Sequence, residues 1–198
     1  MTRGRPREFD PDAALDQVLP VFWRDGFDGA SVQDLADAVG VSKPSLYAAY
    51  GNKESLYLAA LQRYADLHSA QRVAMLDAEP DGREAMRRFM RATVESYTDS
   101  THPSGCLVVM GTTACESATL PDAVRAALCA SMREAAAVIE TRLVRAQQEG
   151  HLPADVDAKA MAGYFNTVMA GLSVQAKAGA QRDALLRVVD EAMRSWPS

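Results

Sequence analysis

The segment Ser31–Tyr50, SVQDLADAVGVSKPSLYAAY, constrains the fold more than any other part of the chain. Ala36 is small where a second helix must cross closely, and Gly40 stands where a tight turn needs a positive φ that favours glycine. Ser42 is a good N-cap for the second helix. Five apolar side chains complete the contact between the two helices: Val32, Leu35, Val39, Val41 and Leu46. The segment therefore predicts a helix-turn-helix, with a plain helical hairpin as the alternative.

The rest of the chain is predicted to be helical as well. Alanine and other good helix formers dominate, and no stretch alternates with the period of two that a half-buried strand requires. Caps and breakers divide the sequence into about nine helices, at approximately 11–26, 32–39, 43–50, 53–77, 83–97, 106–117, 121–149, 154–178 and 182–195. The fold class is therefore all-α, with an N-terminal three-helix domain at residues 1–52 and a C-terminal helical domain at 53–198.

Composition and charge describe an ordinary globular chain. Of the 198 residues, 48% are hydrophobic and 24% are charged, and the net charge is −5. Arg3, Arg5 and Arg7 form a basic arm, but a DNA binder without sequence preference would be strongly basic throughout. No apolar run is long enough to cross a bilayer, and the first ten residues lack the apolar stretch of a secretory signal. We therefore expect a cytoplasmic protein with no membrane partner.

The residues in and around the predicted helix-turn-helix resemble the TetR/AcrR family of transcriptional repressors. The resemblance covers about residues 5–65, and beyond it the chain matches the family only in being helical and of the right length. Tyr50 departs slightly, because the family usually has Phe at this position. The matching residues are Ala14, Phe22, Gly26, Phe27, Ser31, Val32, Leu35, Ala36, Val39, Gly40, Val41, Ser45, Leu46, Tyr47, Lys53, Glu54 and Leu56.

This resemblance implies a function. A family member is a homodimer that binds an inverted-repeat operator in double-stranded DNA and is released by a small-molecule effector, most simply as a repressor. The sequence shows no nucleophile–base–orienter set and no phosphate loop, so we expect neither an enzyme nor a cofactor. The fourth helix, at about 53–77, is expected to be the only continuous element shared by the DNA-binding and effector-binding parts.

Candidate DNA contacts gather on the second helix of the motif and beside it. Lys43 can donate to guanine or phosphate, and Ser45 can donate to either. Tyr47 is expected to donate to a phosphate, with simple packing as its alternative. Lys53, at a helix N-terminus, is expected to clamp a phosphate. The full set is Arg3, Arg5, Arg7, Ser31, Ser42, Lys43, Pro44, Ser45, Tyr47, Tyr50 and Lys53. For the arginine arm, a solvated tail is as good an interpretation as contact with DNA.

The last two predicted helices, 154–178 and 182–195, are apolar on more than one side. A helix of this kind must be covered on both sides. In a family homodimer the last two long helices of each subunit form a four-helix interface, whereas in a monomer the same side chains would simply fill the core. We expect the dimer, because one half-site contact per monomer would be weak.

The C-terminal domain also carries candidates for effector binding. The chain has nine methionines, which suit an adaptable apolar cavity, although ordinary core packing is the alternative for each residue. The candidates are Phe89, Met90, Tyr97, Met110, Met132, Phe165 and Met169. No metal is expected, since His68, His102, His151 and the cysteines lack close ligand spacing. Cys106 follows Gly105 at a helix start, but a small buried residue is favoured over a thiol switch there.

Overall fold

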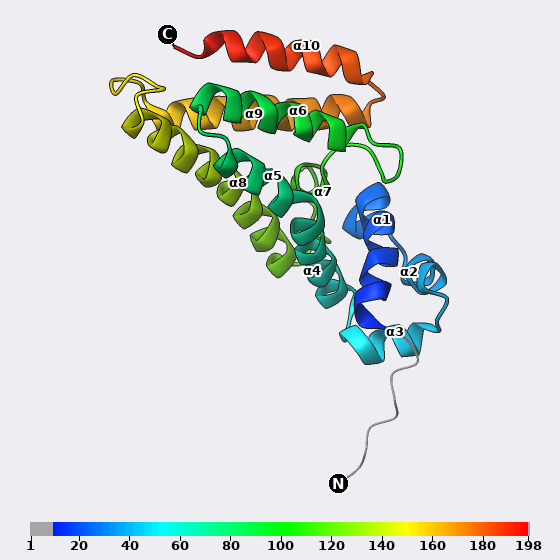
Figure 1. The fold of residues 1–198 in the computed structure, drawn as a ribbon. Coiled ribbons are helices and arrows are strands. Elements are labelled where there is room, and N and C mark those ends of the chain that lie inside the picture. Colours follow the sequence, from blue (N-terminus) through cyan, green and yellow to red (C-terminus); the bar gives the residue numbers. More distant parts are fainter. Residues whose placement is uncertain (1–9, 198) are drawn as a thin grey trace.

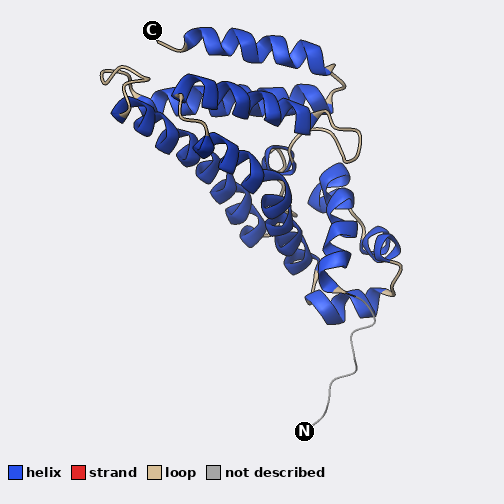
Figure 2. Cartoon of the chain, in the orientation of Figure 1, coloured by secondary structure: helices blue, strands red, loops and turns tan. Residues whose placement is uncertain are grey.

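The computed structural model describes residues 10–197, and every regular element in this range is a helix (Figures 1 and 2). The first three helices form a small head, and the remaining helices form a larger body. The head consists of α1 (Pro11–Gly29), α2 (Val32–Val39) and α3 (Lys43–Tyr50). The body consists of α4 (Lys53–Tyr64), η1 (Ala65–Ser69), α5 (Ala70–Ala78), α6 (Gly82–Tyr97), α7 (Leu107–Thr112), α8 (Asp122–Gln148), α9 (Ala158–Lys177), α10 (Arg182–Ala192) and η2 (Met193–Ser195). The all-α prediction is confirmed for the described range.

Helix α1 holds the head together. The Asp10 carboxylate caps it by accepting a hydrogen bond from the Asp12 amide, and a proline occupies its first position. Phe22 and Trp23 are buried on its inner face. The regular helix breaks at Gly26, whose φ is 71°, and one further turn carries the chain to Gly29. The predicted end at Gly26 thus marks this break, which turns the chain towards α2.

One long path, α4–η1–α5, joins the head to the body. The sequence predicted a single helix at about 53–77, and the structure keeps it continuous but inserts a π-helical turn at Ala65–Ser69. Counted as one helix, this path brings the described residues to the predicted nine. A π-helical turn adds one residue to the repeat, so it rotates the helix face that follows. Helix α7 is shorter than the predicted 106–117, since it ends at Thr112 and continues as turns.

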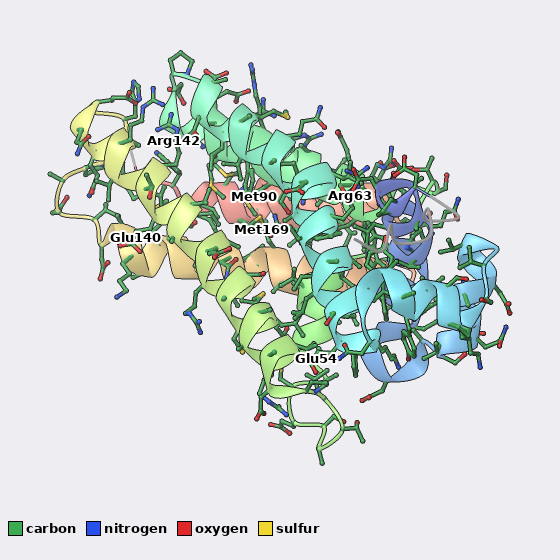
Figure 3. The ribbon with its side chains drawn as sticks, turned by 90° about the horizontal axis from the view of Figure 1, so that it is seen from below. Glu54, Arg63, Met90, Glu140, Arg142 and Met169 are labelled. Atoms are coloured by element: carbon green, nitrogen blue, oxygen red, sulfur yellow. The ribbon has the colours of Figure 1, made fainter. Side chains whose placement is uncertain are left out.

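The body packs α8 along α9 and α5 along α6, with α10 covering α6 and α9 (Figure 1). Met90 of α6 and Met169 of α9 point into the middle of the body in Figure 3. Arg142 of α8 is also buried, at 2% exposure, and its guanidinium donates to three backbone carbonyls at the end of α5 and just beyond it: Leu76, Glu79 and Pro80. These contacts fix the end of α5 against α8.

None of the helices among residues 10–197 combines the length and the apolar character that crossing a lipid bilayer would require.

Candidate DNA-binding and effector-binding sites

The predicted helix-turn-helix is formed by α2 and α3. Ser31 and Asp34 make a capping box at the start of α2, in which each side chain accepts a hydrogen bond of 3.1 Å from the other residue's amide. Gly40 adopts the left-handed conformation with φ 72°, and the Val41 amide closes the turn by donating to the Ala36 carbonyl at 3.0 Å. Leu35, Ala36 and Leu46 are fully buried between the helices. Ala36 therefore allows the close helix crossing and Gly40 forms the turn, as the sequence predicted.

Helix α3 presents its N-terminal end to solvent. Ser42 caps it by accepting from the Ser45 amide at 3.3 Å. Lys43 and Pro44 are exposed, whereas Ser45 and Tyr47 are half-buried. An exposed first turn on a short helix is the part of a helix-turn-helix that enters a major groove.

Tyr50 has a different environment from the other candidates on α3. Its hydroxyl donates to the Pro11 carbonyl, which ties the end of α3 to the start of α1. A phenol has one proton, so in this arrangement Tyr50 cannot also donate to a phosphate. The Tyr50 ring packs against the core as expected, and its hydroxyl adds a bond within the head.

Lys53 stands at the first position of α4, which Asn52 caps by accepting from the Ser55 amide at 2.8 Å. The Lys53 ammonium lies 4.7 Å from the centre of the Phe27 ring, and burial lowers the pKa of Lys53, partly offset by Asp28. The ammonium is thus held close to the helix N-terminus, where an anion would also be attracted. The predicted arm of Arg3, Arg5 and Arg7 lies outside the described residues.

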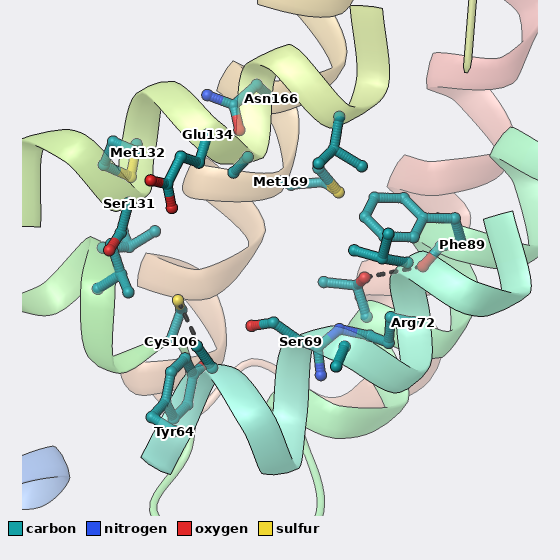
Figure 4. Close-up of a pocket in the computed structure, with 18 of the residues that line it drawn as sticks. Tyr64, Ser69, Arg72, Phe89, Cys106, Ser131, Met132, Glu134, Asn166 and Met169 are labelled. Carbon is teal, nitrogen blue, oxygen red and sulfur yellow. Dashed lines mark hydrogen bonds between the residues drawn. The ribbon is translucent and has the colours of Figure 1, made fainter. Parts of the chain in front are cut away.

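A cavity of about 590 Å³ lies in the body, between the path α4–η1–α5 and helices α6, α7, α8 and α9 (Figure 4). Four of the predicted effector residues line it: Phe89, Tyr97, Met132 and Met169. Half of the other lining residues are apolar: Leu61, Ala65, Ala70, Val73, Ala74, Val108, Val109, Ala135, Val138 and Ala170. This volume is in the range of small-molecule binding sites in proteins.

Three predicted effector residues do not line this cavity. Met90 follows Phe89 on α6, and successive helical residues point about 100° apart, so Phe89 faces the cavity while Met90 is buried in the core. Phe165 is also fully buried and lies 6.4 Å, ring to ring, from Trp196. Met110 lies on α7 next to Val109, which takes the cavity-facing position. The residue type was suitable in each case, but the helix register directs these side chains elsewhere.

Apart from Tyr97, the polar part of the wall was not predicted. The Tyr64 hydroxyl donates to the Cys106 sulfur at 3.3 Å, and burial raises the pKa of both Tyr64 and Tyr97, which keeps these hydroxyls neutral. Arg72 lines the cavity and donates to Ser96 at 3.1 Å. Opposite it, Figure 4 shows Ser131, Glu134 and Asn166 on α8 and α9; Asp66 and Asp77 complete the charged residues of the wall. A 3.6-residue period through 61–77 could have indicated several of these residues, but the π-helical turn shifts it.

No group of three or more potential metal-ligating side chains occurs among residues 10–197. Cys106, Cys115 and Cys129 are all free thiols. Cys106 stands at the start of α7, as predicted, and its side chain is buried at the cavity wall.

Comparison with known proteins identifies the family of this chain. Residues 15–60 match the family described as bacterial regulatory proteins, tetR family, and residues 82–192 match the tetracyclin repressor-like C-terminal domain. The chain belongs to the TetR family. This TetR-family protein is therefore a DNA-binding transcriptional regulator and not an enzyme. The C-terminal match also corrects the expectation that only length and helicity link the body to the family.

Individual relatives extend over almost the whole chain. The protein is 33% identical over 199 residues to the HTH-type transcriptional repressor ComR of Escherichia coli (strain K12), covering 99% of this chain and 93% of that protein. It is 28% identical to the repressor BdcR of the same organism, covering 89% and 83%. Among solved structures, a cysteine variant of the TetR family transcriptional regulator CifR, complexed with 26-bp double-strand operator DNA, matches with a TM-score of 0.93 and 42% identity, covering 98% of this chain and 100% of that one.

Proposed function

We propose that this protein is a homodimeric transcriptional repressor that binds an inverted-repeat operator and leaves it when a small molecule occupies the body cavity. One observation carries the proposal: the path α4–η1–α5 begins at Lys53, beside the helix-turn-helix, and its later turns form one wall of the cavity. A ligand that moves this wall therefore moves an element attached to the head. The names of ComR and BdcR as repressors, and the operator complex of CifR, support the same function.

The proposed DNA contacts lie at the head's exposed end. Lys43 and Ser45 are assigned to base edges or phosphates in the major groove, and Ser31, Tyr47 and Lys53 to phosphates. Ser31 uses its oxygen to accept from the Asp34 amide, which leaves its hydroxyl proton for a phosphate. Ser42 and Pro44 form the first turn that approaches the groove, and the arm of arginines is assigned to the DNA backbone. We also propose residues 1–52 as the DNA-binding domain, 53–198 as the effector-binding and dimerisation domain, and a cytoplasmic location.

The proposed dimer interface uses α9 and α10. In a single chain, Tyr164 and Val174 of α9 remain 42% and 44% exposed, and Val188 of α10 remains 46% exposed. Large apolar side chains on two neighbouring helices favour a second copy as their cover. Two α9–α10 pairs would form the four-helix interface expected for the family.

The test is selection of DNA from a random pool by the full-length protein, with its mass in solution measured by sedimentation. We expect a dimer and a selected sequence with two symmetric half-sites, about 34–36 Å or one DNA turn apart or a multiple of it. A protein carrying Lys43→Ala serves as the matched control and should select with altered base preference. A monomer that selects an asymmetric sequence would contradict the proposal.

A further inference from the structure

Besides its connection through α4, the head packs on the body through α1, whose buried Trp23 stacks on the His102 ring with 4.4 Å between centroids. It also makes a polar contact with the body. The carboxylate of Asp28, in the last turn of α1, accepts hydrogen bonds from Ser117 at 3.1 Å and from Thr119 at 2.8 Å. Both hydroxyls lie in the connection between α7 and α8, far from Asp28 in the sequence. We propose that Asp28, Ser117 and Thr119 form a latch that holds the head in the orientation that binds operator DNA. The inference rests on the proposed operator binding and adds positioning residues to it.

The hydrogen-bond geometry makes the latch a connected unit. The Ser117 and Thr119 hydroxyls also lie 2.6 Å from each other, so two hydroxyl protons serve three contacts. If Ser117 donates to Thr119, Thr119 still donates to Asp28; if both donate to Asp28, the carboxylate receives two bonds. At least one bond to the charged carboxylate is present in either case. Asp28 and Thr119 are solvent-exposed, so water screens this bond and its expected contribution is modest.

The body side of the latch is fixed to α8. Arg125 of α8 donates to the backbone carbonyls of Ser117 at 3.1 Å and Leu120 at 3.3 Å, which holds this connection in place. The two helices that the connection joins both line the cavity, with Val109 on α7 and Met132 on α8 among the lining residues. A ligand that separates these helices therefore displaces the latch. This route to the head runs in parallel with α4 and was not expected from the sequence.

The head side also makes a second polar contact with the body. Lys177, at the end of α9, donates to the Arg24 carbonyl of α1 at 3.1 Å. The polar contacts of Asp28 and Arg24 thus flank the break at Gly26, beside the packing of Trp23 on His102. The similarity to the CifR variant in its operator complex, with a TM-score of 0.93 over 98% of the chain, supports the latched orientation as the DNA-binding one.

Because Asp28 is negatively charged, its removal distinguishes a role in holding the head from a purely electrostatic effect on DNA binding. A carboxylate on a DNA-binding head repels phosphates, so its removal alone should raise affinity for DNA. The latch predicts the opposite, because a head that has lost this contact samples more orientations and must be ordered on binding. In a dimer the loss counts twice, so a threefold loss per head becomes a loss of about ninefold per operator.

The experiment measures operator affinity by fluorescence anisotropy at several salt concentrations, using the selected inverted repeat. We expect Asp28→Ala to lower affinity about fivefold to tenfold with an unchanged salt slope, because no phosphate contact is lost. Asp37→Ala, which removes an exposed carboxylate elsewhere on the head, is the control and should leave affinity unchanged or raise it. The double variant Ser117→Ala, Thr119→Val changes no charge and should lower affinity by a similar factor.

Combining the head and body substitutions completes the test. The triple variant should bind no more weakly than the weaker of its two parents, because both parents already lose the same contact between head and body. Unchanged or raised affinity for Asp28→Ala, or losses that multiply in the triple variant, would overturn the latch. If Asp28→Ala does not fold, as judged by circular dichroism, the Ser117 and Thr119 variant decides alone. Failure of the wild-type protein to bind any inverted repeat would instead refute the proposed function.

Discussion

Arg142 provides the sharpest test of how the body is held together. Its buried guanidinium donates to the carbonyls of Leu76, Glu79 and Pro80 at 3.1, 2.9 and 3.0 Å. The substitution Arg142→Met replaces the guanidinium by an apolar side chain with a similar aliphatic stem, and it leaves the three carbonyls without this donor. An unsatisfied buried acceptor costs about 1 kcal/mol. The Leu76 carbonyl is buried and those of Glu79 and Pro80 are only partly buried, so we expect a loss of about 2 kcal/mol in the free energy of unfolding.

The assay is thermal unfolding followed by circular dichroism, at one protein concentration because a dimer's Tm depends on concentration. For a chain of this length, about 2 kcal/mol corresponds to a decrease in Tm of about 4–8 °C. Arg145→Met is the matched control: its side chain is 42% exposed, donates to the exposed Asp77 carbonyl at 2.9 Å and pairs with Glu149 at 2.8 Å. This exposed pair is expected to contribute less than about 1 kcal/mol. Equal decreases in Tm for the two variants would refute the role assigned to Arg142.

Three further predictions concern the DNA contacts, the packing of α7 and the pH dependence of stability. Lys53→Ala should weaken binding to all DNA sequences alike and reduce the salt slope by about two units per dimer, whereas Lys43→Ala should also change base preference. An unchanged salt slope for Lys53→Ala in anisotropy titrations would exclude a contact between Lys53 and a phosphate. Gly111→Ala would place a Cβ 2.7 Å from the buried Leu128 side chain, so chemical denaturation should show a loss of about 1–3 kcal/mol, and a variant as stable as wild type would contradict this. Burial lowers the pKa of His68 from 6.5 to about 4, so between these pH values the imidazole is neutral in the folded protein and protonated in the unfolded chain. The free energy of unfolding should therefore fall as the pH decreases from 6.5 to 4, and His68→Phe should reduce this dependence. Parallel Tm–pH profiles for the variant and the wild type would contradict this role of His68.

The head could be predicted closely because its residues act locally. A serine cap, a small residue at the crossing and a glycine with positive φ each specify a conformation within a few residues, as Ser31, Ala36 and Gly40 do here. The helix boundaries of α2 and α3 followed from the same signals. The hydroxyl bond of Tyr50 to Pro11 spans 39 positions and had no sequence signature.

The body was predictable in composition but not in detail. Adjacent residues such as Phe89 and Met90 are equally apolar, and only the packing of α6 decides which one faces the cavity. The π-helical turn at 65–69 changes the face of the following residues, which brings Ser69 and Arg72 to the cavity wall. The latch joins residues about 90 positions apart through short polar side chains, which no periodicity reveals.

The central claim is that a ligand in the cavity and the operator oppose each other's binding. Mass spectrometry of protein purified from its host identifies the co-bound molecule, and calorimetry then measures that molecule's affinity with and without the selected operator. Linkage requires the two effects to be equal, so we expect the operator to weaken ligand binding by the factor by which the ligand weakens operator binding, about 5- to 150-fold. Equal ligand affinity in the two titrations would contradict the claim that the cavity controls the DNA-binding head.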